Sequence, residues 1–258
     1  MAFPLLPVRI LHADPALGRV RAIAPSLEGA VIWAGADAGV LLEVGRGGPL
    51  IRRIHAHKGG VTCLAVSKGI LVTGGNDGRV RVWSSESLEC LSQWEAPGKR
   101  AHAVRIDPSR GTVWSLGRNG WSAEWSLGGV ATRPPCDEGS EARRDLEDEV
   151  GAVTFGDLCV RTVGRRAEGW SREGKVWEVD LPGFKWAEAM AGIGEVVWIA
   201  GRNQDRMVLL ARVLCADPTK ARTAFLPYGA TSLATAGEAN VLIAGGAGRI
   251  FAIDVPAV

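Results

Sequence analysis

The chain has 258 residues, of which 47% are hydrophobic and 22% are charged, a composition that is typical of ordered globular proteins and excludes an intrinsically disordered chain. The opening stretch MAFPLLPVRILHADP has no basic region at its start and no apolar run long enough to cross a bilayer, so we expect no signal peptide, no membrane anchor and a cytoplasmic location. The net charge is only +2, but 24 arginines stand against 6 lysines, and this ratio with few amide side chains suits a GC-rich genome or a thermophilic source.

Short apolar segments joined by glycine-containing polar turns recur along the chain, about one hairpin every 40 residues. Each is an apolar run, a turn and a second apolar run, as in ILVTGGNDGRVRVW, which ends at Trp83. The hairpins lie at 30–44, 70–83, 111–125, 195–210 and 240–254. A further apolar strand begins ahead of each repeat unit, near residues 20, 61, 101, 150, 186 and 230. A more polar fourth strand follows, as in the segments that end at Ala56 and Ala96.

Four antiparallel strands per unit and six units predict an all-β, six-bladed β-propeller that spans residues 1–258 as a single domain. The last unit reaches the end of the chain after its third strand. The N-terminal strand at 5–13 resembles the fourth strand of the first unit, and both directly precede a first strand. We therefore expect the N-terminal strand to complete the last blade, because this pairing covers two edges that would otherwise be exposed.

The second unit resembles a WD40 repeat, and the residues that carry this resemblance lie between Ala56 and Ser84. Ala56-His57 stands at the family's "GH" position, Asp77 at the turn aspartate and Trp83-Ser84 at the "WD" position. The resemblance implies a buried hydrogen-bonded tetrad, which would consist here of His57, Thr73, Asp77 and Trp83. The motif is complete in this unit alone; Trp125 and Trp170 keep only the tryptophan, so we expect packing to hold the other blades together.

The same residues suggest a second interpretation, in which His57 is a general base, Thr73 a nucleophile and Asp77 the group that orients the base. Because a blade interior offers neither a cleft nor oxyanion donors, a structural role is the better prediction. The chain has no GxSxG, HExxH or P-loop motif and no group of Asp, Glu and His with metal-ligand spacing. Its five cysteines are widely separated and include no CxxC pair. We expect no catalytic residues, no metal and no cofactor.

Ten tryptophans raise the alternative of stacking platforms for bases or sugars. Trp33, Trp114 and Trp198 occupy the strand position that holds Val72 or Leu242 in other units, so we predict that they belong to the core. Another four are expected at strand ends or on outer strands and are freer: Trp94, Trp121, Trp177 and Trp186. If any of them binds a partner, Trp121 or Trp186 is the better candidate, but a core role is the prediction for these too.

The loops between the second and third strands, and between the fourth strand and the next unit, should gather on one face of a propeller. Asp37 and Asp77 are the clear acids in these turns. Such a face would attract an acidic peptide or a nucleic-acid backbone, although a solvated surface in an arginine-rich protein is the alternative. The basic residues in these loops are Lys58, Arg79, Lys99, Arg100, Arg118, Arg165, Arg166 and Arg202.

An acidic insertion at 134–149 lengthens the interval between the third and fourth units, with seven acids and two arginines after Cys136. Ser140 could cap a short helix there. The insertion is either an exposed loop or an arm that folds over the basic face and competes with the partner.

The sequence thus predicts a non-enzymatic scaffold, a subunit of an intracellular complex that binds an acidic protein partner through its basic loop face. A nucleic-acid-binding propeller, with RNA as its ligand, is the alternative, and a cryptic hydrolase is the third possibility. We expect neither a membrane nor a small-molecule substrate among its partners.

Overall fold

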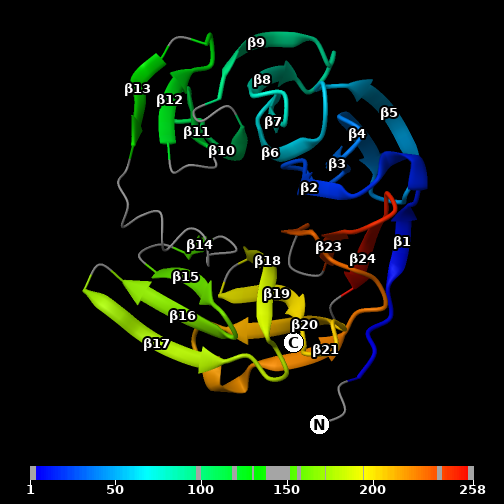
Figure 1. Cartoon of the computed structure of the whole chain (residues 1–258), viewed down its shortest axis with the longest axis vertical. Coiled ribbons are helices and arrows are strands. Elements are labelled where there is room, and N and C mark those ends of the chain that lie inside the picture. Colours follow the sequence, from blue (N-terminus) through cyan, green and yellow to red (C-terminus); the bar gives the residue numbers. More distant parts are fainter. Residues whose placement is uncertain are drawn as a thin grey trace. The chain divides into compact units, whose positions relative to one another are not determined.

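The structure is a computed structural model that describes residues 4–96, 100–117, 121–129, 131–137, 152–155, 158–171, 173–193, 195–236 and 240–254. The regular structure of these residues consists of β-strands and two short 3₁₀ helices, η1 (Pro15–Leu17) and η3 (Pro218–Lys220). The strands form six four-stranded antiparallel sheets (Figure 1). This is the make-up of a six-bladed β-propeller, so the predicted fold class is confirmed.

The chain divides into two compact units, each of which holds three sheets. We call Leu11–Arg143 with Ala247–Arg249 the first-half unit. Its strands, in sheet order, are β2 (Val20–Pro25), β3 (Val31–Ala36), β4 (Val40–Gly45) and β5 (Leu50–His55) in the first sheet; β6 (Val61–Ser67), β7 (Ile70–Gly75), β8 (Arg79–Ser84) and β9 (Cys90–Glu95) in the second; and β10 (Ala101–Asp107), β11 (Thr112–Gly117), β12 (Trp121–Ser126) and β13 (Ala131–Asp137) in the third.

The second-half unit contains Met1–Ile10, Arg144–Gly246 and Ile250–Val258. Its strands are β14 (Ala152–Phe155), β15 (Leu158–Val163), β16 (Arg166–Ser171) and β17 (Gly174–Asp180) in the fourth sheet; β18 (Trp186–Ile193), β19 (Val196–Arg202), β20 (Val208–Leu214) and β21 (Arg222–Phe225) in the fifth; and β22 (Ser232–Thr235), β23 (Asn240–Ala244) and β24 (Ile250–Asp254) in the sixth. The first strands begin within two residues of the predicted positions.

The sixth sheet has the order β1-β24-β23-β22, where β1 is Arg9–His12, so the N-terminal strand completes the last blade as predicted (Figure 1). β1 is shorter than the expected strand at 5–13. The residues before it pair instead with the outer strand of the fifth sheet, where Leu6 N donates to Phe225 O at 3.0 Å and Phe225 N donates to Pro4 O at 2.8 Å. The N-terminal segment therefore supports the edges of two successive sheets.

Neighbouring sheets pack so closely that glycine is required on the second strand. A side chain at Gly35 would collide with Val61 of the second sheet, and one at Gly74 would collide with Ala101 of the third. The first strands of the first, second, third and fifth sheets all carry a β-bulge one or two residues from their start. The repeat units therefore share the position of a β-bulge as well as the pattern of strands.

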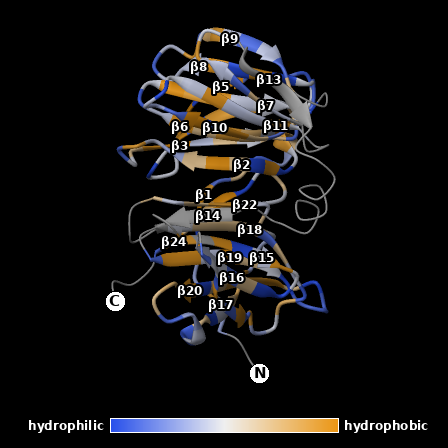
Figure 2. Ribbon diagram, turned by 90° about the vertical axis from the view of Figure 1, so that its left-hand side faces the viewer, coloured by the Kyte–Doolittle hydropathy of each residue, from blue (hydrophilic) through white to orange (hydrophobic). Residues whose placement is uncertain are grey.

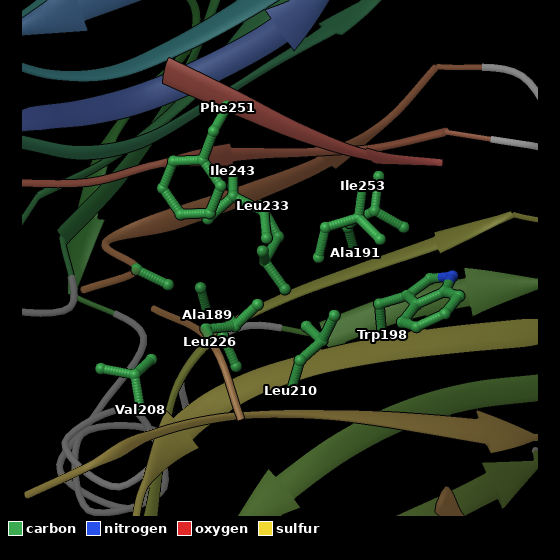
Figure 3. Packing of buried hydrophobic residues seen from close by; sticks show 13 residues of the cluster. Ala189, Ala191, Trp198, Val208, Leu210, Leu226, Leu233, Ile243, Phe251 and Ile253 are labelled. Atoms are coloured by element: carbon green, nitrogen blue, oxygen red, sulfur yellow. The ribbon is translucent and has the colours of Figure 1, made fainter. Parts of the chain in front are cut away.

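Each pair of adjacent sheets within a unit encloses apolar side chains. Between the fifth and sixth sheets, Trp198 and Leu210 lie opposite Ile243, Phe251 and Ile253 (Figure 3). The ribbon coloured by hydropathy shows hydrophobic segments within the strands and hydrophilic residues in many of the turns that join them (Figure 2). The alternation of apolar and polar residues thus places the core between the sheets.

The acidic insertion begins later than predicted, because residues 134–137 belong to the end of β13. The remainder of the insertion, including the expected helix at Ser140, lies outside the described residues. Among the helices of the described residues, none has the length and apolar character needed to cross a bilayer. Cys63, Cys90 and Cys215 are free thiols.

Candidate functional site

The four residues of the predicted tetrad meet inside the second sheet. His57 lies in the connection from β5 to β6, Thr73 on β7, Asp77 in the turn from β7 to β8 and Trp83 on β8. His57 Nδ1 lies 2.8 Å from Asp77 Oδ1, and His57 Nε2 lies 2.8 Å from Thr73 Oγ1. The Trp83 indole N–H donates to Thr73 Oγ1 at 2.9 Å. The contacts form a continuous chain from Trp83 to Asp77, as the sequence predicts.

The proton positions follow from the partners. Arg81 Nη1 lies 2.6 Å from His57 Nδ1 and 2.8 Å from Asp77 Oδ2, and we assign its hydrogen bond to the carboxylate. Asp77 then accepts from both His57 and Arg81, so His57 carries its proton on Nδ1 and accepts the Thr73 hydroxyl proton at Nε2. Burial lowers the pKa of His57, which keeps the imidazole neutral, although the carboxylate of Asp77 opposes this effect. Burial alone would raise the pKa of Asp77, but the hydrogen bonds from Arg81 and His57 lower it to about 2.

This arrangement does not fit the hydrolytic interpretation. Thr73 is 0% exposed and His57 is 3% exposed, so a substrate carbonyl could not reach the hydroxyl. The hydroxyl oxygen also accepts the indole proton of Trp83, so one of its lone pairs is already engaged. Among the described residues, no group of three His, Cys, Asp or Glu side chains could hold a metal ion. The tetrad is therefore a structural feature of the blade.

Two other sheets keep part of this network, which the sequence analysis missed. In the third sheet, Trp125 donates to Ser115 Oγ at 3.1 Å, and Ser115 precedes its tryptophan by ten residues, as Thr73 precedes Trp83. In the fourth sheet, Trp170 donates to Glu168 Oε2 at 2.9 Å. A search for Ser or Thr ten residues before each tryptophan would have found the first of these pairs.

The two turn acids of the first-half unit are paired with arginines that the sequence analysis did not count. Asp37 accepts from Arg21 and from Arg19, the latter at 3.3 Å, and these contacts hold its pKa below the usual value although burial opposes them. Asp77 pairs with Arg81 at 2.8 Å. Both carboxylates, predicted as the acids of a basic face, are thus neutralised within their own sheets.

The turns that carry these groups form one continuous surface. The connection at 56–60 packs against the turn after β3, because Gly39 O accepts from the backbone N–H groups of Ala56 and His57. It also packs against the turn after β7, where Asn76 N donates to Gly60 O. Gly39 has a positive φ of 75°, and a side chain there would collide with the backbone at His57. The connection before β10 joins this surface through the bond from Ala96 N to Gly78 O.

We call this region the basic loop surface and define it by Arg19, Arg21, Lys58, Arg79, Arg81 and Arg100. Lys58 N and Arg79 N both donate to the carboxylate of Asp77, so these two residues lie on either side of the tetrad. Within the described residues, the side chains of Lys58, Arg79 and Arg100 make no ion pair. Glu95 lies opposite Arg79 in the strand register.

The basic residues predicted in the second-half unit have a different environment. Arg165 pairs with Asp180 at 3.7 Å, Arg166 pairs with Glu178, and Arg202 pairs with Glu188 at 2.7 Å. These acids lie on strands and were not counted with the turns. Lys99 and Arg118 lie outside the described residues. The structure thus leaves Lys58, Arg79 and Arg100 as the predicted residues whose charge has no described partner.

The tryptophans expected to be free are mostly committed to packing. Trp94 is 6% exposed and stacks on Trp125 with ring centroids 5.3 Å apart, so its prediction as a freer residue is wrong. Trp177 packs against the core of the fourth and fifth sheets. Trp186 is half-buried beneath the ammonium group of Lys185, and its indole donates to Glu188 at 3.3 Å. The side chain of Trp121 lies outside the described residues.

Comparison with known proteins agrees with this description. The family model of the WD domain, G-beta repeat (WD40) matches residues 48–84, the segment that contains the tetrad. The chain is 33% identical over 92 residues to Striatin-4 of Mus musculus, a match that covers 33% of this chain and 12% of Striatin-4. It is 30% identical over 69 residues to WD repeat-containing protein 91 of Gallus gallus, covering 26% of this chain and 9% of that protein.

The matched segment spans only about a tenth of the length of these relatives. Among solved structures, that of U3-55K has a TM-score of 0.71 and 11% identity, and the match covers 96% of this chain and 98% of the other. At this identity the similarity shows the fold alone.

Proposed function

We propose that this chain, a WD40-repeat β-propeller, is a non-enzymatic interaction scaffold that binds an acidic segment of a partner protein through the basic loop surface. The observation that carries the proposal is the pairing of Asp37 and Asp77 within their own sheets. Because arginines neutralise both carboxylates, Lys58, Arg79 and Arg100 remain available to an external anion. Basic groups without a competing internal partner speed the encounter with an acidic ligand and retain more of the charge interaction when it binds.

The rigidity of the surface supports the same proposal. The backbone N–H groups of Lys58 and Arg79 are hydrogen-bonded to the carboxylate of Asp77. That carboxylate is held in turn by His57 and Arg81. A partner would therefore meet cations whose backbone positions are already ordered, which lowers the entropic cost of binding. Arg165, Arg166 and Arg202 of the second-half unit would first have to break ion pairs, so we assign them a minor role in binding.

A charge-reversal experiment tests the proposal. The probe is a fluorescent 12-residue peptide of alternating Glu and Ser, and the readout is fluorescence anisotropy in low salt. Changing Lys58, Arg79 and Arg100 together to Glu should weaken binding at least tenfold. The control changes Arg105, Arg206 and Arg222 to Glu, which alters the net charge equally on exposed residues outside the surface.

Two results would overturn the proposal. One is equal loss of affinity in both triple variants, which would indicate a nonspecific charge effect. The other is binding of a single-stranded RNA of the same length that is much tighter than the peptide and falls steeply between low and moderate salt; this would favour the nucleic-acid alternative.

The acidic insertion provides a related test. If it folds over the basic loop surface as a tethered competitor, deleting residues 138–149 should increase the affinity for the acidic peptide severalfold. The deletion starts at residue 138 because the preceding residues form the end of β13. Unchanged affinity in the same anisotropy assay would show that the insertion does not compete for the surface, and the role of the surface would be unaffected.

We also propose a cytoplasmic location, with which the free thiols of Cys63, Cys90 and Cys215 are compatible.

A further inference from the structure

A groove lies between the first and second sheets. The turns that line it are at one end of the strands, and the basic loop surface is at the other end. β2 starts beside that surface at Val20 and ends at Pro25, and the turn that follows it forms one wall of the groove. The other wall is formed by the turn after β6 and the turn after β8. The groove has a volume of about 590 Å³, which is large enough for two or three amino-acid side chains.

The groove is preformed, because Arg52 ties its two walls together. The Arg52 guanidinium donates to Glu43 within the first sheet. It also donates to the backbone carbonyls of Ser85, at 3.0 Å, and of Glu86 in the second sheet. Glu43 is 7% exposed, so its charge is satisfied by Arg52 and does not define the electrostatics of the opening. The shape of the groove is thus held by an ion pair and by hydrogen bonds to backbone carbonyls.

The rim of the groove combines apolar and acidic groups. Leu27 is 66% exposed, and Val31 and Val66 are partly exposed behind it. The exposed carboxylates of Glu28 and Glu86 face solvent from the two walls, and neither forms an ion pair within the part of the chain that the structure describes. Lys68, also exposed, is the cation on the rim.

We propose that this groove binds a short partner segment in which an apolar side chain is flanked by lysine or arginine. The apolar side chain would cover Leu27, Val31 and Val66, and the flanking cations would pair with Glu28 on one wall and Glu86 on the other. Removing Leu27 from water supplies affinity, and the two carboxylates select the charge of the partner. The required charge is opposite to that of the ligand proposed for the basic loop surface. The first-half unit is therefore a scaffold with two ends that accept oppositely charged segments.

The experiment starts from a phage-displayed library of random 12-residue peptides, selected against the intact wild-type chain. The most enriched peptide is then synthesised, labelled and titrated by fluorescence anisotropy, with its scrambled sequence as a reference. We expect the enriched peptides to share an apolar residue between basic ones. The paired substitution Glu28→Lys and Glu86→Lys should weaken binding at least tenfold, and Leu27→Asp should do the same without reversing either carboxylate.

The triple variant of Lys58, Arg79 and Arg100 is the matched control, because it reverses charge at the other end of the same unit. It should leave the affinity of the selected peptide within about twofold, so the groove and the basic loop surface are tested separately. Failure to enrich any peptide of this kind would overturn the proposal. So would an enriched peptide whose affinity is unchanged by the Glu28→Lys and Glu86→Lys pair.

Discussion

Thr73 is the residue on which the tetrad depends, because its hydroxyl oxygen is both the donor to His57 and the acceptor for Trp83. A hydroxyl is the smallest side-chain group that can fill both roles at once. Ser115 performs the acceptor half of this function for Trp125 in the third sheet. The two residues therefore provide a matched comparison of two buried hydrogen bonds with one.

Thr73→Val should lower the free energy of unfolding by about 2–3 kcal/mol, because it keeps the side-chain shape but leaves a buried imidazole nitrogen and a buried indole N–H without partners. Ser115→Ala should cost about 1 kcal/mol, since it removes one bond. Urea unfolding followed by tryptophan fluorescence measures both values. A smaller loss for Thr73→Val than for Ser115→Ala would contradict the role assigned to the tetrad.

The tetrad also predicts a dependence of stability on pH. Burial lowers the pKa of His57, so the unfolded chain binds a proton more readily below about pH 6.5 and stability falls as the pH decreases from neutrality. Asp77 has a folded-state pKa of about 2, so its contribution is present above about pH 4 and is lost as the pH falls toward 2. The variant Asp77→Asn should lose less stability than the wild type between pH 4 and pH 2.5, as measured by urea unfolding at each pH. Parallel curves would contradict this assignment.

At the scale of the element, the six sheets fill one pair of buried positions, on the second and third strands, in two different ways. The positions equivalent to Thr73 and Trp83 hold buried apolar pairs in the first, fifth and sixth sheets: Ala34 and Val44, Ile199 and Val213, and Ile243 and Ile253. These sheets are held by packing, as the sequence predicts. The second, third and fourth sheets use hydrogen-bonded tryptophans instead, because a buried indole N–H needs an acceptor.

The fourth sheet replaces the tetrad with an ionic arrangement. Arg161 occupies the position of Thr73, donates to Glu168 at 3.1 Å and lies 4.6 Å from the centre of the Trp170 ring. Glu168 is 6% exposed. Burial alone would raise its pKa, but the hydrogen bonds from Trp170 and Arg161 lower it. Lys175 lies 3.8 Å from the other oxygen of Glu168, so this carboxylate connects two cations and an indole.

Glu168→Leu should therefore lower the free energy of unfolding by about 3 kcal/mol, because it removes the buried carboxylate that accepts from both the Arg161 guanidinium and the Trp170 indole. Adding Arg161→Met should restore part of this loss, since it removes the partly buried positive charge that Glu168 no longer balances. A thermodynamic cycle from urea unfolding of the two single variants and the double variant measures the coupling. Additive losses would show that Arg161 and Glu168 do not depend on each other.

At the scale of the whole molecule, the N-terminal segment completes the sixth sheet and pairs with the outer strand of the fifth. Leu6 and Val8 pack on the core between the fifth and sixth sheets, β1 pairs with β24, and Leu6 pairs with Phe225. Without this segment, two strand edges and part of an apolar core would be exposed to water. The protein therefore depends on contacts between residues that are more than 200 positions apart in the chain.

Deleting residues 1–12 should lower the melting temperature by about 5 °C or more and promote aggregation, because it exposes the edge of β24. Differential scanning fluorimetry and size-exclusion chromatography measure these effects. Arg9→Ala is the control; it removes only the exposed contact with Asp254 and should shift the melting temperature by about 1 °C or less. A deletion variant that behaves like the control would show that the strand is dispensable.

The sequence alone was sufficient to predict the strands, their grouping in fours, the N-terminal strand in the last sheet and the tetrad. These features depend on local alternation, on turn residues and on a motif whose four polar residues lie within one sheet. Only the tertiary structure showed which charged side chains pair with one another. Asp37 is neutralised by Arg19 and Arg21, and Arg202 is neutralised by Glu188, because the folded strands and turns of one sheet place these charges side by side and no motif in the sequence marks the pairs. The groove beside Leu27 could not be predicted either, since its walls come from two sheets and the sequence pattern describes one sheet at a time.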